Sequence, residues 1–68
     1  MRYTLADIVT SITYGRVREG CVYESEEGVR MLYISGVLRW LTIGNYISNP
    51  VTISPETIET TFKIVREG

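Results

Sequence analysis

The fold is decided by residues 29–43, which read VRMLYISGVLRWLTI. Two runs rich in aliphatic and aromatic residues flank Ser35-Gly36, a pair typical of a two-residue β-hairpin turn. A two-residue turn fixes the register of both strands, because each residue before the turn then has one partner after it. The sequence therefore predicts an antiparallel hairpin in which Ile34 pairs with Val37 and the remaining pairs follow in step.

The two faces of this hairpin differ in kind. The first is nearly all apolar and is the expected core face beneath a helix: Val29, Met31, Tyr33, Leu38, Trp40 and Thr42. The second sets two arginines among aliphatic residues: Arg30, Leu32, Ile34, Val37, Arg39, Leu41 and Ile43. A solvated antiparallel face is normally polar, so we expect the second face to be covered. Three coverings are open: the C-terminal segment in a two-layer core, a second subunit, or a ligand held by the arginines.

Residues 4–14 are predicted to form a helix. Thr4 is the expected N-cap, and Asp7 stands three residues later, where its carboxylate completes a capping box or favours the helix dipole. The apolar residues recur at helical spacing and form one stripe, which consists of Leu5, Ile8, Val9 and Ile12.

The remaining segments are shorter. Glycine, asparagine and proline mark residues 44–50 as a loop. Ser54-Pro55-Glu56 combines an N-cap, a proline at the first helical position and an acid in the first turn. We expect strands at Cys21–Ser25, 51–53 and 60–65, with one helical turn after Ser54.

Length and charge narrow the class of protein. The chain has 68 residues, which is enough for one domain over 1–68. It holds one cysteine, Cys21, and no histidine, so an internal disulfide is excluded and a zinc site is not expected. A hydrophobic content of 44% in so small a domain favours a homo-oligomer.

The composition also argues against nucleic acids and membranes as partners. A net charge of −1 lacks the basic excess of a nucleic-acid binder. The apolar runs are far shorter than the roughly 18–20 residues that cross a membrane, and the N-terminus lacks the apolar core of a signal peptide. The free cysteine agrees with a reducing compartment. We therefore expect a cytoplasmic protein that uses neither membrane nor nucleic acid.

The sequence shows no catalytic arrangement. Cys21 has no histidine to activate it, and the carboxylates are expected in caps, turns and tails. The glycines stand singly rather than in a phosphate-binding loop. The sequence therefore predicts a non-enzymatic protein without a cofactor.

Aromatic residues add to the candidate binding residues. The chain has five tyrosines and one tryptophan, which usually pack with a polar edge in water but also suit stacking on a ligand. Tyr46 is expected to be exposed in the polar loop beside Asn45, where binding residues are common. The candidate binding residues are Arg30, Arg39, Trp40, Asn45 and Tyr46.

The order of features resembles a family of small bacteriophage-encoded domains that includes anti-Thoeris sponges. The matching pieces are the central hairpin, Leu5-Ala6-Asp7-Ile8-Val9, Gly15-Arg16-Val17, Ile53-Ser54-Pro55-Glu56-Thr57-Ile58 and Phe62-Lys63-Ile64-Val65. The resemblance implies an oligomer that sequesters a cyclic-nucleotide immune signal. A Gly-Trp segment of that domain is missing after Val17, where Arg18-Glu19-Gly20-Cys21 stands, so no ligand residue is carried over.

We therefore expect an α+β fold, with an N-terminal helix packed on a small, mainly antiparallel sheet of three to five strands. The expected function is that of a phage-encoded binding protein that inhibits a host defence factor or sequesters a small anionic, nucleotide-like signal. The alternatives are a small structural or regulatory subunit of a larger assembly, and a weak nucleic-acid-binding module.

Overall fold

The computed structural model describes residues 1–44 and 46–68, and its central hairpin has the predicted register. β3 (Arg30–Ile34) pairs with β4 (Val37–Leu41) through five antiparallel pairs, from Arg30 opposite Leu41 to Ile34 opposite Val37. Ser35 and Gly36 have φ values of 53° and 75°, the left-handed conformation that a tight turn of this type requires at both positions. β3 begins one residue later than predicted and β4 ends two residues earlier, because Val29, Thr42 and Ile43 lie outside the strands.

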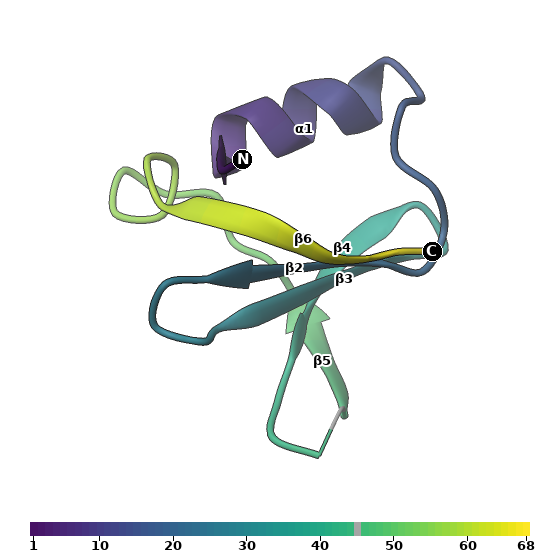
Figure 1. Cartoon of the computed structure of the whole chain (residues 1–68), viewed down its shortest axis with the longest axis vertical. Helices are drawn as coiled ribbons and strands as arrows, with labels where there is room; N and C mark the ends of the chain where they lie inside the picture. Colours follow the sequence, from purple (N-terminus) through teal and green to yellow (C-terminus); the bar gives the residue numbers. More distant parts are fainter. Residues whose placement is uncertain (45) are drawn as a thin grey trace.

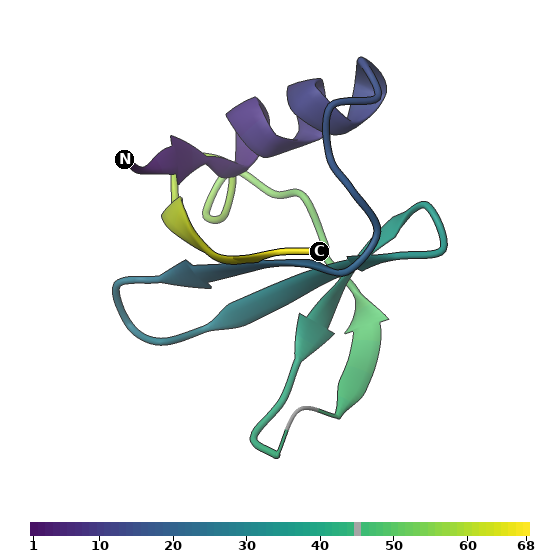
Figure 2. The same ribbon diagram turned by 45° about the vertical axis from the view of Figure 1, so that its right-hand side comes forward.

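The hairpin lies inside a six-stranded antiparallel sheet. Its other strands are β1 (Tyr3–Thr4), β2 (Cys21–Ser25), β5 (Ile47–Pro50) and β6 (Thr61–Glu67), and the order across the sheet is β1-β6-β2-β3-β4-β5. With one helix beside it, the fold is α+β as expected, but the sheet has more strands than the predicted three to five. Figures 1 and 2 show the β4–β5 hairpin bent away from α1.

Two segments differ from the sequence prediction. The expected loop at 44–50 contains β5, which pairs with β4 through Leu41–Ile47 and Arg39–Pro50. Pro50 is tolerated there because β5 is an edge strand, paired on one side. The strand expected at 51–53 is absent, although Val51 N still donates to Leu38 O at 2.9 Å. Pairing with β4 thus outweighs the local turn signal.

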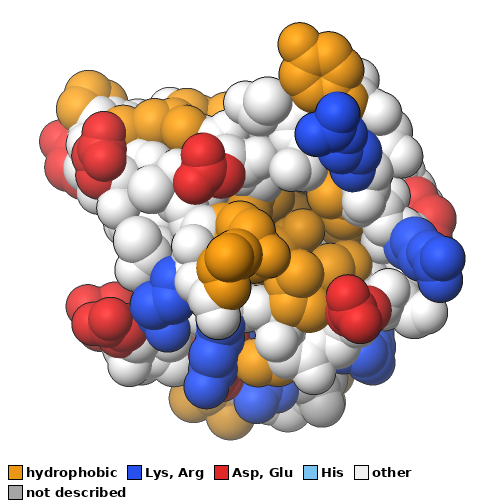
Figure 3. Space-filling model, turned by 45° about the horizontal axis from the view of Figure 1, so that its top comes forward, with side chains coloured by type: hydrophobic (Ala, Val, Ile, Leu, Met, Phe, Trp, Pro, Cys, Tyr) orange, Lys and Arg blue, Asp and Glu red, His pale blue; other side chains and the backbone are white. Residues whose placement is uncertain are grey.

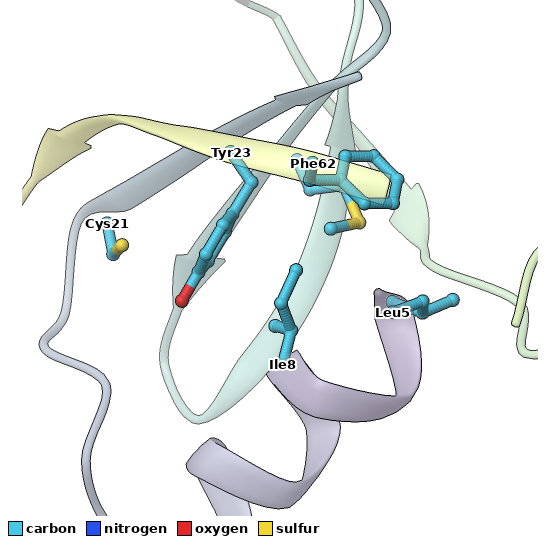
Figure 4. Packing of buried hydrophobic residues seen from close by; sticks show 6 residues of the cluster. Leu5, Ile8, Cys21, Tyr23 and Phe62 are labelled. Carbon is cyan, nitrogen blue, oxygen red and sulfur yellow. The ribbon is translucent and has the colours of Figure 1, made fainter. Parts of the chain in front are cut away.

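The helix α1 (Leu5–Thr13) forms where the apolar spacing predicted it. Thr4 caps it, because its hydroxyl accepts from Asp7 N at 3.1 Å while the Asp7 carboxylate accepts from Thr4 N at 3.1 Å. α1 lies across one face of the sheet (Figure 1). Its buried Leu5 and Ile8 pack on the sheet in the core cluster (Figure 4), which also contains Cys21, Tyr23, Met31 and Phe62.

The C-terminal segment does not fold over the second face of the hairpin, which corrects one of the three expected coverings. Residues 55–59 form a turn in which Ile58 N donates to Ser54 O at 2.9 Å, as the helix-start signal indicated. The following strand, β6, then pairs with both β2 and β1 in the plane of the sheet. No described segment therefore lies over the sheet face opposite α1.

Loss of the helix cap should lower stability. We expect Thr4→Ala to reduce the free energy of unfolding by about 1 kcal/mol, because the Asp7 amide loses its acceptor. For a domain of this size, the melting temperature should then fall by about 4–8 °C in a thermal denaturation followed by circular dichroism. Thr13→Ala, in the same helix, is the matched control and should leave the melting temperature within about 2 °C; equal losses in both variants would contradict the capping assignment.

Candidate functional site

The sheet face opposite α1, here called the outer face, is built from two cross-strand rows. The strand registers place Lys63, Glu24, Arg30, Leu41 and Ile47 in one row. They place Arg66, Val22, Leu32, Arg39 and Pro50 in the other. Opposed residues in a sheet share a face, so these ten side chains stand on the same side. The second face of the hairpin is thus the centre of a larger surface.

Charge is segregated onto this outer face. It carries four of the chain's seven basic residues and one of its eight acidic residues, Glu24. The whole chain has a net charge of −1, so the local excess is positive where the composition suggests no preference. A surface of this kind attracts anions and disfavours cationic partners.

A groove of about 370 Å³ crosses the outer face. It is lined by four apolar and two basic side chains: Val22, Leu32, Leu41, Ile47, Arg30 and Arg66. Val22 and Leu32 are only 5% and 6% exposed and form an apolar floor. The volume falls within the range of about 300–1,000 Å³ typical of small-molecule sites. Apolar walls with two convergent cations suit a ligand that has an apolar body and an anionic group.

Both arginines of the groove are anchored through one nitrogen. Arg30 Nε donates to Glu24 Oε2 at 2.9 Å, and Arg66 Nε donates to Gly20 O at 3.1 Å. A guanidinium has five N–H donors, so each keeps donors for a ligand while its orientation is restrained. The hydrogen bond from Arg30 lowers the pKa of the Glu24 carboxyl below its ordinary value, which keeps Glu24 ionised and in competition for Arg30.

The structure separates the residues predicted from sequence. Arg30 lines the groove, whereas Arg39 Nη1 donates to Ser48 O at 3.1 Å and lies outside it. Trp40 packs against the core cluster on the opposite face. Tyr46 is 73% exposed between β4 and β5, and Asn45 lies outside the described residues. Of the four described candidates, only Arg30 belongs to the groove.

Sequence reasoning missed Arg66, Val22 and Ile47, because each reaches the groove through pairing between strands that are distant in sequence. A bulge in β6 opposite Val22–Tyr23 also shifts the alternation, so Arg66 shares a face with Lys63 despite their odd spacing. The alternation of apolar and charged residues in β6 was a signal for a half-buried strand, but it did not specify the neighbour.

A second hollow lies on the opposite side of the sheet. Figure 3 shows hydrophobic side chains at the bottom of a depression on the side that carries α1, with charged side chains around it. A hollow of about 280 Å³ on this side is lined by Arg16, Val17, Arg18, Cys21, Tyr23, Ile64 and Glu67. Figure 4 shows Cys21 and Tyr23 on the same side of the sheet as α1. Burial raises the pKa of both side chains, so the thiol and the phenol are neutral at physiological pH.

Residues 1–44 and 46–68 contain no group of three or more potential metal-binding side chains from histidine, cysteine, aspartate and glutamate. Within the same residues, no helix has the length and apolar character needed to cross a membrane.

Comparisons with known proteins do not extend this description. No family model, no curated protein and no solved structure matches the chain.

The buried thiol should react slowly. Because the thiolate is the nucleophile and burial raises the pKa of Cys21, we expect the folded protein to react with iodoacetamide far more slowly than a free thiol at neutral pH. The rate, followed by intact mass, should increase with pH and should keep rising at a pH above the ordinary pKa of cysteine, because the pKa of Cys21 is raised. The same protein unfolded in urea is the control and should react at the rate of a free thiol; fast labelling of the folded chain would contradict the burial of Cys21.

Proposed function

We propose that the protein is a non-enzymatic binding protein that sequesters a small organic anion of nucleotide-like chemistry in the outer-face groove. The observation that carries this proposal is the pair Arg30 and Arg66 beside an apolar floor. A guanidinium fork matches the oxygens of a phosphate or carboxylate, and the aliphatic residues suit the face of a base or another apolar body. Both parts of such a ligand thus find a partner in one groove.

The resemblance to small phage-encoded domains supports the same proposal. Sequestration requires a site that holds a ligand without converting it, and the groove offers cations and apolar side chains rather than a nucleophile with a base. A counter-defence role, in which the protein removes an immune signal from a host cell, follows as part of the proposal. An oligomer, as the resemblance implies, would increase the number of grooves per assembly.

Inhibition of a host protein is the second candidate, and exposed apolar residues at the turn end of the β4–β5 hairpin favour it. Ile43 is 98% exposed, and Tyr46 and Ile47 are 73% and 50% exposed. Apolar and aromatic residues that project together from a hairpin suit the centre of a protein interface. Ile47 also lines the groove, so the two surfaces adjoin.

Removal of either groove arginine should weaken anion binding. We expect calorimetric titration with adenosine monophosphate and a cyclic dinucleotide to show saturable binding of at least one of them. Arg30→Ala and Arg66→Ala should each raise the Kd by about 10-fold or more, because each removes charge-assisted hydrogen bonds. Arg16→Ala, which removes an arginine on the α1 side, is the matched control and should leave the Kd unchanged.

Two results would overturn this assignment. The first is that neither nucleotide binds at millimolar concentration, and the second is that all three arginine variants lose affinity equally. Binding of a DNA duplex with a steep salt dependence, and of no mononucleotide, would instead assign the basic face to nucleic acid.

Removal of Glu24 should have the opposite effect. Glu24→Gln takes away the carboxylate that competes for Arg30, so we expect the Kd of the same nucleotide to fall by up to about fivefold. Because the pKa of Glu24 is lowered, wild-type protein should show this gain only when the pH falls below that depressed pKa. Glu27→Gln, in the β2–β3 turn, makes the same charge change outside the groove and serves as the control. Weaker binding by Glu24→Gln would contradict the competition.

A further inference from the structure

β6 is paired along only part of one edge. On one side, its residues from Phe62 to Glu67 pair with β2. On the other side, only Thr61 and Phe62 pair with β1, which is two residues long. Residues 63–67 therefore have no strand beside them on that edge within the described part of the chain. A row of unpaired backbone groups is a template for an added strand.

The backbone of β6 directs hydrogen-bonding groups toward this free edge. Leu5 N donates to Thr60 O at 3.1 Å, and Tyr3 stands opposite Phe62. In an antiparallel ladder, alternate residues of a strand point their N–H and C=O to the same side, so Ile64 follows Phe62 in facing away from β2. An incoming strand would thus continue the ladder that β1 begins as far as Ile64, after which the bulge in β6 shifts the alternation.

Space lies alongside the same edge. A groove of about 520 Å³ is lined by Met1, Tyr3, Ile64, Val65, Arg66 and Glu67. Ile64 and Glu67 also line the hollow on the α1 side, so the two depressions adjoin at β6. Side chains of an added strand would enter this space beside Tyr3 and Ile64. The free edge is therefore accessible as well as unpaired.

The charge of the residues around this edge determines which kind of added strand can bind. Basic residues mark the outer-face side of this edge, where the register places Lys63 and Arg66. The one acidic residue in their rows, Glu24, is paired with Arg30. The same edge of a second copy carries the same basic excess and would be repelled. A lysine and a bulge, both present in β6, are features that limit indiscriminate pairing of edge strands. An acidic strand with alternating apolar residues satisfies both the charge and the hollow.

We infer that the free edge of β6 is a docking site for an extended segment of a partner protein in which acidic and apolar residues alternate. The segment adds a strand next to residues 63–67, and its apolar side chains enter the depressions beside Ile64 on the α1 side. Its carboxylates point to the opposite face and meet Lys63 and Arg66. This site shares Arg66 with the outer-face groove but does not depend on the ligand of that groove.

Labelled peptides test the backbone part of this inference. The probe is a short blocked peptide of alternating valine and glutamate, and binding is followed by fluorescence anisotropy. We expect saturable binding that becomes weaker when salt is added. N-methylation of the alternate peptide nitrogens that face β6 should abolish binding, whereas N-methylation of the other alternate set should leave binding intact. Failure of this peptide to bind, or equal binding of both methylated peptides, would overturn the inference. So would equal binding of a peptide with lysine in place of glutamate.

Charge reversal in the protein tests the expected preference of the β6 edge for an acidic peptide. Lys63→Glu should raise the Kd for the valine–glutamate peptide by about fivefold or more, because an exposed cation on the carboxylate side of the added strand becomes an anion. Arg30→Glu places one reversal on the outer face and should leave peptide binding unchanged while it weakens nucleotide binding. Peptide affinity that falls with Arg30→Glu, and not with Lys63→Glu, would place the peptide in the outer-face groove and overturn the edge site.

Discussion

The register fixed by the Ser35-Gly36 turn is the constraint on which the rest of the structure depends. Side chains alternate between faces of a sheet, so a slip by one residue would move Met31 to the outer face and Arg30 into the core. The turn needs a positive φ at both positions, which glycine adopts freely and serine at some cost. With this register, Met31 is fully buried and Arg30 stands on the outer face.

The core that this register organises is small. Its largest fully buried side chains are Leu5, Ile8, Met31 and Phe62, which come from α1, β3 and β6. A domain of this length buries only about 60% of the surface of its unfolded chain, so each cap and core contact is a large share of the total stability. The capping box at Thr4 matters for this reason: it holds the start of α1 where Leu5 must enter the core.

The small size of the domain also explains why the outer face remains apolar and basic. A sheet covered by one helix buries one face, and here no described segment covers the other. Arg30 and Arg66 lie beside Val22 and Leu32 and limit the exposure of this apolar floor with their aliphatic stems. The stems thus reduce the contact of the apolar floor with water, while the guanidinium groups stay within reach of an anion. A binding role for this surface agrees with both its charge and its shape.

Local signals in the sequence determined the elements whose partners lie close along the chain. The hairpin register, the helix over Leu5–Thr13 with its Thr4 cap, and the turn after Ser54 each depend on residues within one short window, so pattern and turn chemistry were enough. The position of Arg30 on the second face of the hairpin was predicted for the same reason, and Arg30 lines the groove there. Only the tertiary structure decided that β6 lies between β1 and β2, that β5 forms from a loop-like segment, and that Arg66 joins Arg30 while Arg39 turns to Ser48. These outcomes depend on contacts between residues far apart in sequence, whose free energy no local window contains.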